Sequence, residues 1–166
     1  MTTAPENYRP MQIVLHWVVV LGILLQWTFN EQIARVANAQ QRGFDAPEGD
    51  LTMALIHVGI GSAIFFAVLG RLYLRYRYGV PDHAPGTSKI QGAIATWMHR
   101  ALYAVLIAMV VTGGLTWNGV AALGGVHFGL NTVLFVLALA HAAAARLYAI
   151  WTTIGLHDPD ADIVTT

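Results

Sequence analysis

The chain has 166 residues and no cysteine, and this absence excludes several kinds of metal site at once. Without thiols there is no disulfide scaffold, no thiolate zinc site, no iron–sulfur cluster and no covalently attached c-type haem. The sequence also lacks a phosphate-binding glycine loop, a dinucleotide-binding glycine pattern, the HExxH zinc motif and a serine nucleophile elbow. Any metal in this protein is therefore expected to be held by histidine.

Charged residues are scarce. They make up 11% of the chain, against 56% hydrophobic residues and a mean hydropathy of +0.55. No Asp, Glu, Lys or Arg occurs within residues 10–30, 51–70 or 101–145. The first two of these segments have the length of one membrane helix, and the third is about twice as long.

The third charge-free segment is interrupted by Trp117-Asn118-Gly119 and by Gly124-Gly125, which suit a turn between two helices. The sequence therefore predicts an all-α integral membrane four-helix bundle, as a single domain over residues 1–166. The four predicted spans are approximately 11–30, 51–74, 97–117 and 127–150.

The basic residues are distributed unevenly between the two sides of the predicted membrane. Most lie before the first span, between the second and third spans, or at the end of the fourth: Arg9, Arg71, Arg75, Arg77, Lys89, Arg100 and Arg146. The positive-inside rule assigns these segments to the cytoplasm, so both termini are expected to be cytoplasmic. This asymmetry is a topology signal, and it gives no support for nucleic-acid binding.

A cleaved signal peptide is the alternative interpretation of the first span, because Arg9 precedes its apolar run and Ala37-Asn38-Ala39 imitates a cleavage site. However, the apolar run is longer than a typical signal core, and several polar residues would separate that core from the cut. We therefore expect the first span to stay in the mature protein.

Four histidines lie inside the charge-free segments: His16, His57, His127 and His141. Ionisable side chains are costly in hydrocarbon and usually mark an ion path, a proton relay or a cofactor. The predicted topology places His57 and His127 near the outer face, and His16 and His141 near the inner face. Each pair can supply both axial ligands of one haem iron, which leaves no open position for oxygen and suits electron transfer.

The last two of these histidines share one predicted helix. His127 and His141 are fourteen residues apart, which corresponds to about 21 Å of helix and nearly restores the same face. One helix can therefore hold two cofactors at two depths. The run from Ala142 to Ala145 has small side chains that let a macrocycle or a neighbouring helix approach closely. Gly61, one turn after His57, can likewise make room for a ring or serve ordinary helix packing.

Short motifs around the histidines carry a family resemblance. They are Leu15-His16-Trp17, Ile56-His57-Val58, the segment from Leu72 to Arg75 with Tyr78 and Pro81, the spacing of His127 and His141, and the run from His141 to Ala145. With these motifs the chain resembles, over nearly its whole length, the bacterial cytochrome b561 family of four-helix, di-haem membrane proteins. The resemblance implies two b haems with the four histidines as axial ligands, His16 paired with His141 and His57 with His127.

The resemblance also implies a function. Electrons would pass through the two haems between the quinone pool of the bacterial inner membrane and a redox partner on the periplasmic side. The protein would supply position and electrostatics while the cofactor does the chemistry. Its expected partners are the lipid bilayer, a quinone or quinol, and a periplasmic electron donor or acceptor. The chain is then either an electron-transfer protein or a quinone-linked oxidoreductase.

Two other functions stay open. The chain can be the membrane cytochrome b subunit of a larger dehydrogenase or hydrogenase complex, which a stable copurifying partner would indicate. Alternatively, the histidines serve metal or proton transport, as intramembrane histidines do in some transporters. A transporter would be colourless, and the scarcity of Asp and Glu within the spans argues against it.

Several further residues have two interpretations. Arg71 and Arg75 are candidates for haem propionate contacts, because arginine pairs strongly with carboxylates. A cytoplasmic arginine cluster is also what the positive-inside rule predicts. His99 is a competing candidate for the inner iron or a neighbour of the propionates, and His83 and His157 are expected to be solvated.

The chain departs from the family pattern before the fourth span. Gly124-Gly125-Val126 directly precede His127, so the outer connection is unusually short and apolar for the family. The segment from Glu31 to Asp50 is a candidate outward-facing contact surface.

Overall fold

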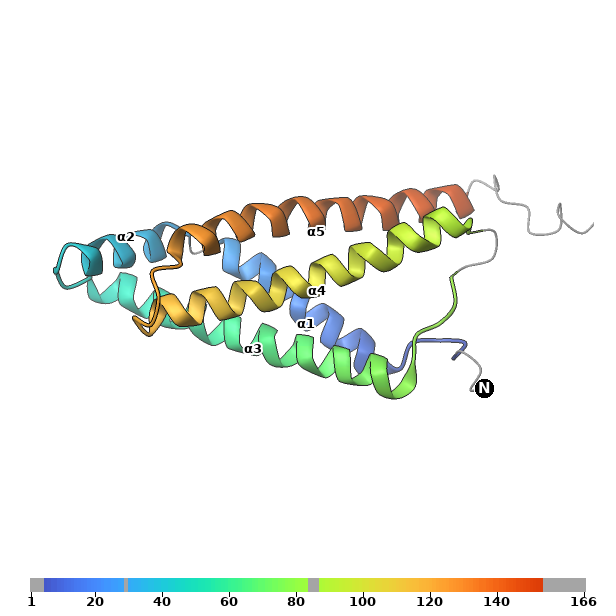
Figure 1. The fold of residues 1–166 in the computed structure, drawn as a ribbon, viewed down its shortest axis with the longest axis horizontal. Coiled ribbons are helices and arrows are strands. Elements are labelled where there is room, and N and C mark those ends of the chain that lie inside the picture. Colours follow the sequence, from blue (N-terminus) through green and yellow to red (C-terminus); the bar gives the residue numbers. More distant parts are fainter. Residues whose placement is uncertain (1–4, 29, 84–86, 154–166) are drawn as a thin grey trace, which may run out of the picture. The chain divides into compact units, whose positions relative to one another are not determined.

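A computed structural model of the chain describes residues 5–28, 30–83 and 87–153. These residues form five helices: α1 (Pro10–Trp27), α2 (Asn30–Gln41), α3 (Glu48–Tyr78), α4 (Lys89–Trp117) and α5 (Gly124–Thr153) (Figure 1). The chain divides into two compact units, residues 1–81 with α1 to α3 and residues 82–166 with α4 and α5, and each unit is described by itself.

Four helices within the described residues are long and apolar enough to cross a membrane. They are Pro10–Trp27, Glu48–Tyr78, Lys89–Trp117 and Gly124–Ile150. The predicted all-α fold class and the four predicted spans are therefore confirmed. The cytoplasmic position of both termini and the single domain over residues 1–166 stay predictions.

In the first unit, α1 packs antiparallel against α3. A Cβ atom added to Gly70 would lie 3.0 Å from Cδ1 of Leu15, and one added to Gly61 would lie 3.3 Å from Nε2 of Gln26. Early residues of α1 thus meet late residues of α3, and late residues of α1 meet early ones. Small residues at such contacts let membrane helices approach closely, which increases van der Waals packing.

Replacing Gly22 with alanine is expected to loosen this contact. A Cβ at residue 22 would lie 2.7 Å from Cγ1 of Ile64, so the helices or the isoleucine must shift. Overpacking of this kind destabilises by about 1–3 kcal/mol. Denaturant unfolding in detergent measures the loss. The matched control is Gly59→Ala in α3, where nothing lies within 4 Å of an added Cβ, and equal stability of the two variants would contradict the prediction.

A polar cluster joins the start of α1 to the end of α3. Gln12 is only 7% exposed, and its side chain accepts a hydrogen bond from the backbone N–H of Arg9 at 2.9 Å and donates one to the carbonyl of Gly79 at 3.2 Å. The backbone carbonyl of Gln12 accepts a hydrogen bond from Nη1 of Arg71 at 2.6 Å. The Arg9 guanidinium lies 3.7 Å from the ring centroid of Tyr78. These contacts fix the register of the two helices at this end.

The connection between the first two spans contains a helix that the sequence analysis did not predict. α2 packs against α3, and each of the two helices has a buried apolar residue: Val36 of α2 is 2% exposed and Ala54 of α3 is 1% exposed. Arg35 donates two hydrogen bonds of 2.7 Å to the Asp50 carboxylate, and this contact raises the pKa of the Arg35 guanidinium above its ordinary value. The segment expected to be an outward-facing surface is therefore held to α3 by an apolar contact and an ion pair.

The start of α4 and the start of α5 both come earlier than predicted. α4 begins at Lys89, because Ser88 accepts a hydrogen bond from the backbone of Gln91 and the Gln91 side chain accepts one from the backbone of Ser88. The prediction that Gly124-Gly125 belong to the turn is wrong, since both lie in α5. The chain turns earlier, at Gly119, whose φ of +68° favours glycine.

Candidate functional site

In the first unit, His16 lies on α1 and His57 lies on α3, and both are half-buried. Nε2 of Gln26 donates a hydrogen bond of 3.0 Å to the backbone carbonyl of His57. His57 is therefore level with the C-terminal end of α1, ten residues or about 15 Å of helix beyond His16. The two histidines of this unit are therefore at different levels along it, and their positions near the inner and outer membrane faces stay a prediction.

The space at Gly61 is used by the Gln26 side chain. A Cβ at residue 61 would lie 3.3 Å from the same Nε2 atom that donates to His57. This observation favours the helix-packing interpretation of Gly61. Gln26 was not singled out in the sequence, because a glutamine near a span end has no local signal that ties it to a histidine 31 residues away.

In the second unit, His127 and His141 both lie on α5 and both are half-buried. The fourteen residues between them belong to one continuous helix, so the two positions are separated by about 21 Å along its axis. α4 packs antiparallel to α5, because His127 contacts residues late in α4 and His141 contacts an earlier one. Each histidine therefore meets a different part of α4.

The ring of His127 is held by the backbone and a side chain of α4. Its Nδ1 atom lies 3.0 Å from the carbonyl oxygen of Met109 and 3.2 Å from Oγ1 of Thr112. A carbonyl oxygen can only accept a hydrogen bond, so we assign the ring proton to Nδ1. The lone pair of the neutral ring is then on Nε2. This is the arrangement of a metal-binding histidine, which typically donates its other ring N–H to a carbonyl or carboxylate.

The ring of His141 lies against His99. The two ring centroids are 5.1 Å apart and the planes meet at 78°, an edge-to-face arrangement. Nδ1 of His99 lies 2.7 Å from the carbonyl oxygen of Ala95, one turn earlier in the same helix, so this nitrogen also carries the proton. His99 is the predicted competitor for the inner iron, and it lies beside His141, one member of the predicted inner pair.

The other residues that the sequence singled out are two arginines and two histidines. Arg71 donates to the backbone carbonyl of Gln12, and Arg75 is half-buried near the end of α3. His83 is exposed, although its ring lies over Gly92, where an added Cβ would be 2.8 Å from Cδ2 of the ring. His157 lies outside the described residues. A propionate contact for either arginine stays a prediction.

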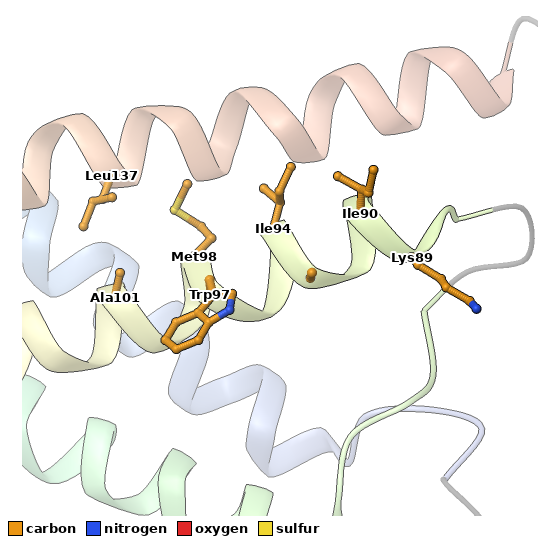
Figure 2. Close-up of a pocket in the computed structure, with 8 residues that line it drawn as sticks. Lys89, Ile90, Ile94, Trp97, Met98, Ala101 and Leu137 are labelled. Atoms are coloured by element: carbon orange, nitrogen blue, oxygen red, sulfur yellow. The ribbon is translucent and has the colours of Figure 1, made fainter.

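The N-terminal half of α4 forms an apolar groove with α5. Its volume is about 580 Å³, and its lining consists of Lys89, Ile90, Ala93, Ile94, Trp97, Met98, Ala101 and Leu137. Figure 2 shows Ile94 and Met98 pointing from α4 toward α5, with Leu137 pointing back toward α4. The lining is apolar apart from the indole N–H of Trp97 and the Lys89 ammonium.

A family model described as prokaryotic cytochrome b561 matches residues 7–155. The curated protein named cytochrome b562 from Cereibacter sphaeroides is 29% identical over 149 residues, which cover 88% of this chain and 89% of that protein. The cytochrome b561 homolog 1 of Escherichia coli strain K12 is 25% identical over 162 residues, covering 90% of this chain and 82% of the relative.

The relative named probable superoxide oxidase CybB, from Yersinia pestis, is 27% identical over 108 residues. This match covers 65% of the present chain and 56% of that protein. No solved structure matches the chain significantly.

Proposed function

Since the chain belongs to the prokaryotic cytochrome b561 family, we propose that it carries electrons between the membrane quinone pool and a redox partner on the periplasmic side, through two bis-histidine b haems. At the coarser level it is a multi-pass bacterial membrane protein and a b-type cytochrome of transmembrane electron transfer. We place it in the inner membrane. The observation that carries the proposal is the position of His127 and His141 at two depths of one membrane helix.

The residues present fit haem b as the cofactor. With Nδ1–H donated to the Met109 carbonyl, His127 holds its Nε2 lone pair in the form that an iron ligand needs. Haem b, when bound, supplies a one-electron iron couple whose potential depends on its axial ligands. Because the chain has no cysteine, attachment relies on these ligands and on packing rather than on thioether bonds.

The proposed pairing follows the depth of each histidine within its own helix. His57 and His127 form the outer pair, and His16 and His141 form the inner pair. Two ligand pairs at two depths require that each unit supply one histidine to each pair. In each unit the two histidines lie at different levels, which supports this requirement. Arg71 and Arg75, at the same end of α3 as the cluster around Gln12, remain the candidates for propionate contacts.

The apolar groove of the second unit is our candidate for the quinone. Its aliphatic lining suits a hydrophobic ring, and the indole N–H of Trp97 is a donor for a quinone carbonyl. Met98 and Leu137 bring the groove to the level of His99 and His141, the inner end of the proposed electron path.

Replacing Trp97 with phenylalanine is expected to weaken quinone binding while preserving the apolar surface. Loss of one hydrogen bond is worth about 0.5–1.5 kcal/mol, or roughly a 2–12-fold rise in the quinol concentration needed for half-maximal reduction. Stopped-flow reduction by a quinol analogue measures this concentration. Trp117→Phe, at the opposite end of α4, is the matched control. Equal behaviour of the two variants would remove the groove from the proposal.

The proposed function is tested with the purified, haem-loaded protein in anaerobic liposomes that contain a quinol. This quinol is expected to reduce the protein. The reduced protein is then expected to reduce a membrane-impermeant acceptor that is present on its periplasmic side. Liposomes without protein are the control. If dithionite reduces the protein but no quinol does, the quinone proposal is wrong.

A second candidate function is favoured by the likeness to the probable superoxide oxidase of Yersinia pestis. In this reaction the periplasmic electron donor is superoxide, which releases one electron and leaves as dioxygen. A pulse of superoxide, added as a superoxide salt, is expected to reduce the oxidised protein and to release dioxygen. If quinol reduces the protein but superoxide does not, the first proposed function stands and superoxide oxidation is contradicted.

The proposal that the chain is a subunit of a larger complex has its own test. Mild detergent extraction from the native membrane is expected to yield the chain alone if it acts by itself. A dehydrogenase or hydrogenase partner at equal stoichiometry would instead assign it to a complex.

A further inference from the structure

We propose that Met109, Thr112 and Gly113 of α4 form a seat that positions the His127 ring for its iron, with Gly113 as the residue on which the position depends. This inference rests on the proposed function, in which His127 is an axial ligand. The three seat residues do not touch the iron, so they are positioning residues.

The seat lies on one face of α4. Residues 109, 112 and 113 are related by the i, i+3 and i+4 spacings that place side chains on the same side of a helix. The carbonyl of Met109 and the hydroxyl of Thr112 approach the same ring atom, Nδ1, at 3.0 and 3.2 Å. Groups of α4 therefore set the hydrogen-bonding direction at Nδ1 of the ring.

Gly113 lets the ring come this close. A Cβ at residue 113 would lie 2.9 Å from Cε1 and 3.2 Å from Nδ1 of His127, and 3.8 Å from Nε2. The first distance is shorter than real Cβ contacts, so a side chain of any size must displace the ring. The ring is not the far end of a flexible chain, because its Nδ1 is held by the Met109 carbonyl.

The neighbouring glycine shows that the close approach to the His127 ring is specific to residue 113. Gly113 and Gly114 both lie inside a continuous helix, where glycine is a poor helix former. An added Cβ at residue 114 would meet nothing within 4 Å. Only the first glycine of the pair is required by a close contact, so Gly114→Ala is a matched control with the same change in composition.

The seat also sets the electronic character of the ligand. Acceptors at Nδ1–H make an imidazole a more basic ligand, and such partners orient the ring at the metal. Displacing the ring with Gly113→Ala is therefore expected to weaken one haem site, and removing the Thr112 hydroxyl is expected to raise the midpoint potential of that haem alone.

The experiment compares Gly113→Ala, Gly114→Ala, His127→Ala and the double variant Gly113→Ala with His127→Ala, each purified with its haem. Haem per chain is measured by pyridine haemochrome, and the two low-spin ferric signals are separated by electron paramagnetic resonance and redox titration. Gly113→Ala is expected to lose, or to shift in g value and potential, the same haem that His127→Ala loses. Gly114→Ala is expected to match the wild type.

The double variant tests whether residue 113 acts through the histidine. It is expected to have the same haem content and spectrum as His127→Ala alone, because a displaced ring no longer matters once the ring is absent. Loss of the second haem as well would show a general structural defect and overturn the proposal. Wild-type spectra and potentials in Gly113→Ala would overturn it too.

Thr112→Val keeps the proposal testable if Gly113→Ala does not assemble. Valine has nearly the shape of threonine and removes the hydroxyl group, which lies 3.2 Å from Nδ1 and also donates to the carbonyls of Ala108 and Met109. A rise in one midpoint potential, confined to the haem that depends on His127, supports the seat, and unchanged potentials contradict it. If His127→Ala keeps both haems, the ligand assignment of the proposed function fails, a result distinct from failure of the seat.

Discussion

Replacing His141 with alanine is expected to leave the protein with one b haem per chain instead of two. The imidazole is proposed as one of two axial ligands of the inner iron, and alanine offers no substitute. The large separation of His141 and His127 along α5, about 21 Å, means that the outer site should survive the change. Pyridine haemochrome per chain and the reduced spectrum measure the loss.

The control for this variant is His99→Ala. The His99 ring lies 5.1 Å from that of His141, but its Nδ1 faces the Ala95 carbonyl of its own helix. Its removal is expected to leave both haems in place and to perturb the spectrum of only the inner one. The opposite result, with a haem lost from His99→Ala and none from His141→Ala, would make His99 the inner ligand.

Double variants are expected to separate the two proposed ligand pairs by haem count. Removing both members of the outer pair, His57 and His127, should leave one haem, because the inner pair is untouched. Removing His57 and His141 together should leave none, because each iron loses one of its two ligands. Ligands of one iron act as a unit, so their losses are not additive, whereas losses at distant sites add.

The haem counts of these double variants can contradict the pairing directly. Two variants with the same number of histidines removed differ only in which histidines they keep. If the His57 and His127 double variant loses both haems while the His57 and His141 variant keeps one, the pairing is reversed. Detergent-solubilised yield and the α-helical circular dichroism signal show that each variant still assembles.

The membrane-spanning helices were the most predictable part of this protein. Charge is so costly in hydrocarbon that three charge-free segments were enough to predict four spans, all confirmed as long apolar helices. The early start of α4 also had a readable signal, since Ser88 and Gln91 form a capping box. Gly124-Gly125 misled because glycine suits a turn, yet it is also tolerated in membrane helices.

The surroundings of the histidines were much less predictable. That Met109 and Gly113 meet His127 depends on the register of α4 against α5, which no local motif encodes. The same holds for Gln26 and the carbonyl of His57. α2 was missed because a short polar helix has little stability of its own, and here the buried Val36 and the Arg35–Asp50 ion pair hold it.

The central claim is that this chain holds two b haems through four histidines, and haem quantification of the wild-type protein tests it most directly. The measurement is a dithionite-reduced minus oxidised absorption spectrum of the purified protein, with pyridine haemochrome per chain. Two low-spin b haems per chain are predicted. A single haem would mean that one ligand pair fails, and a colourless protein would contradict the claim outright.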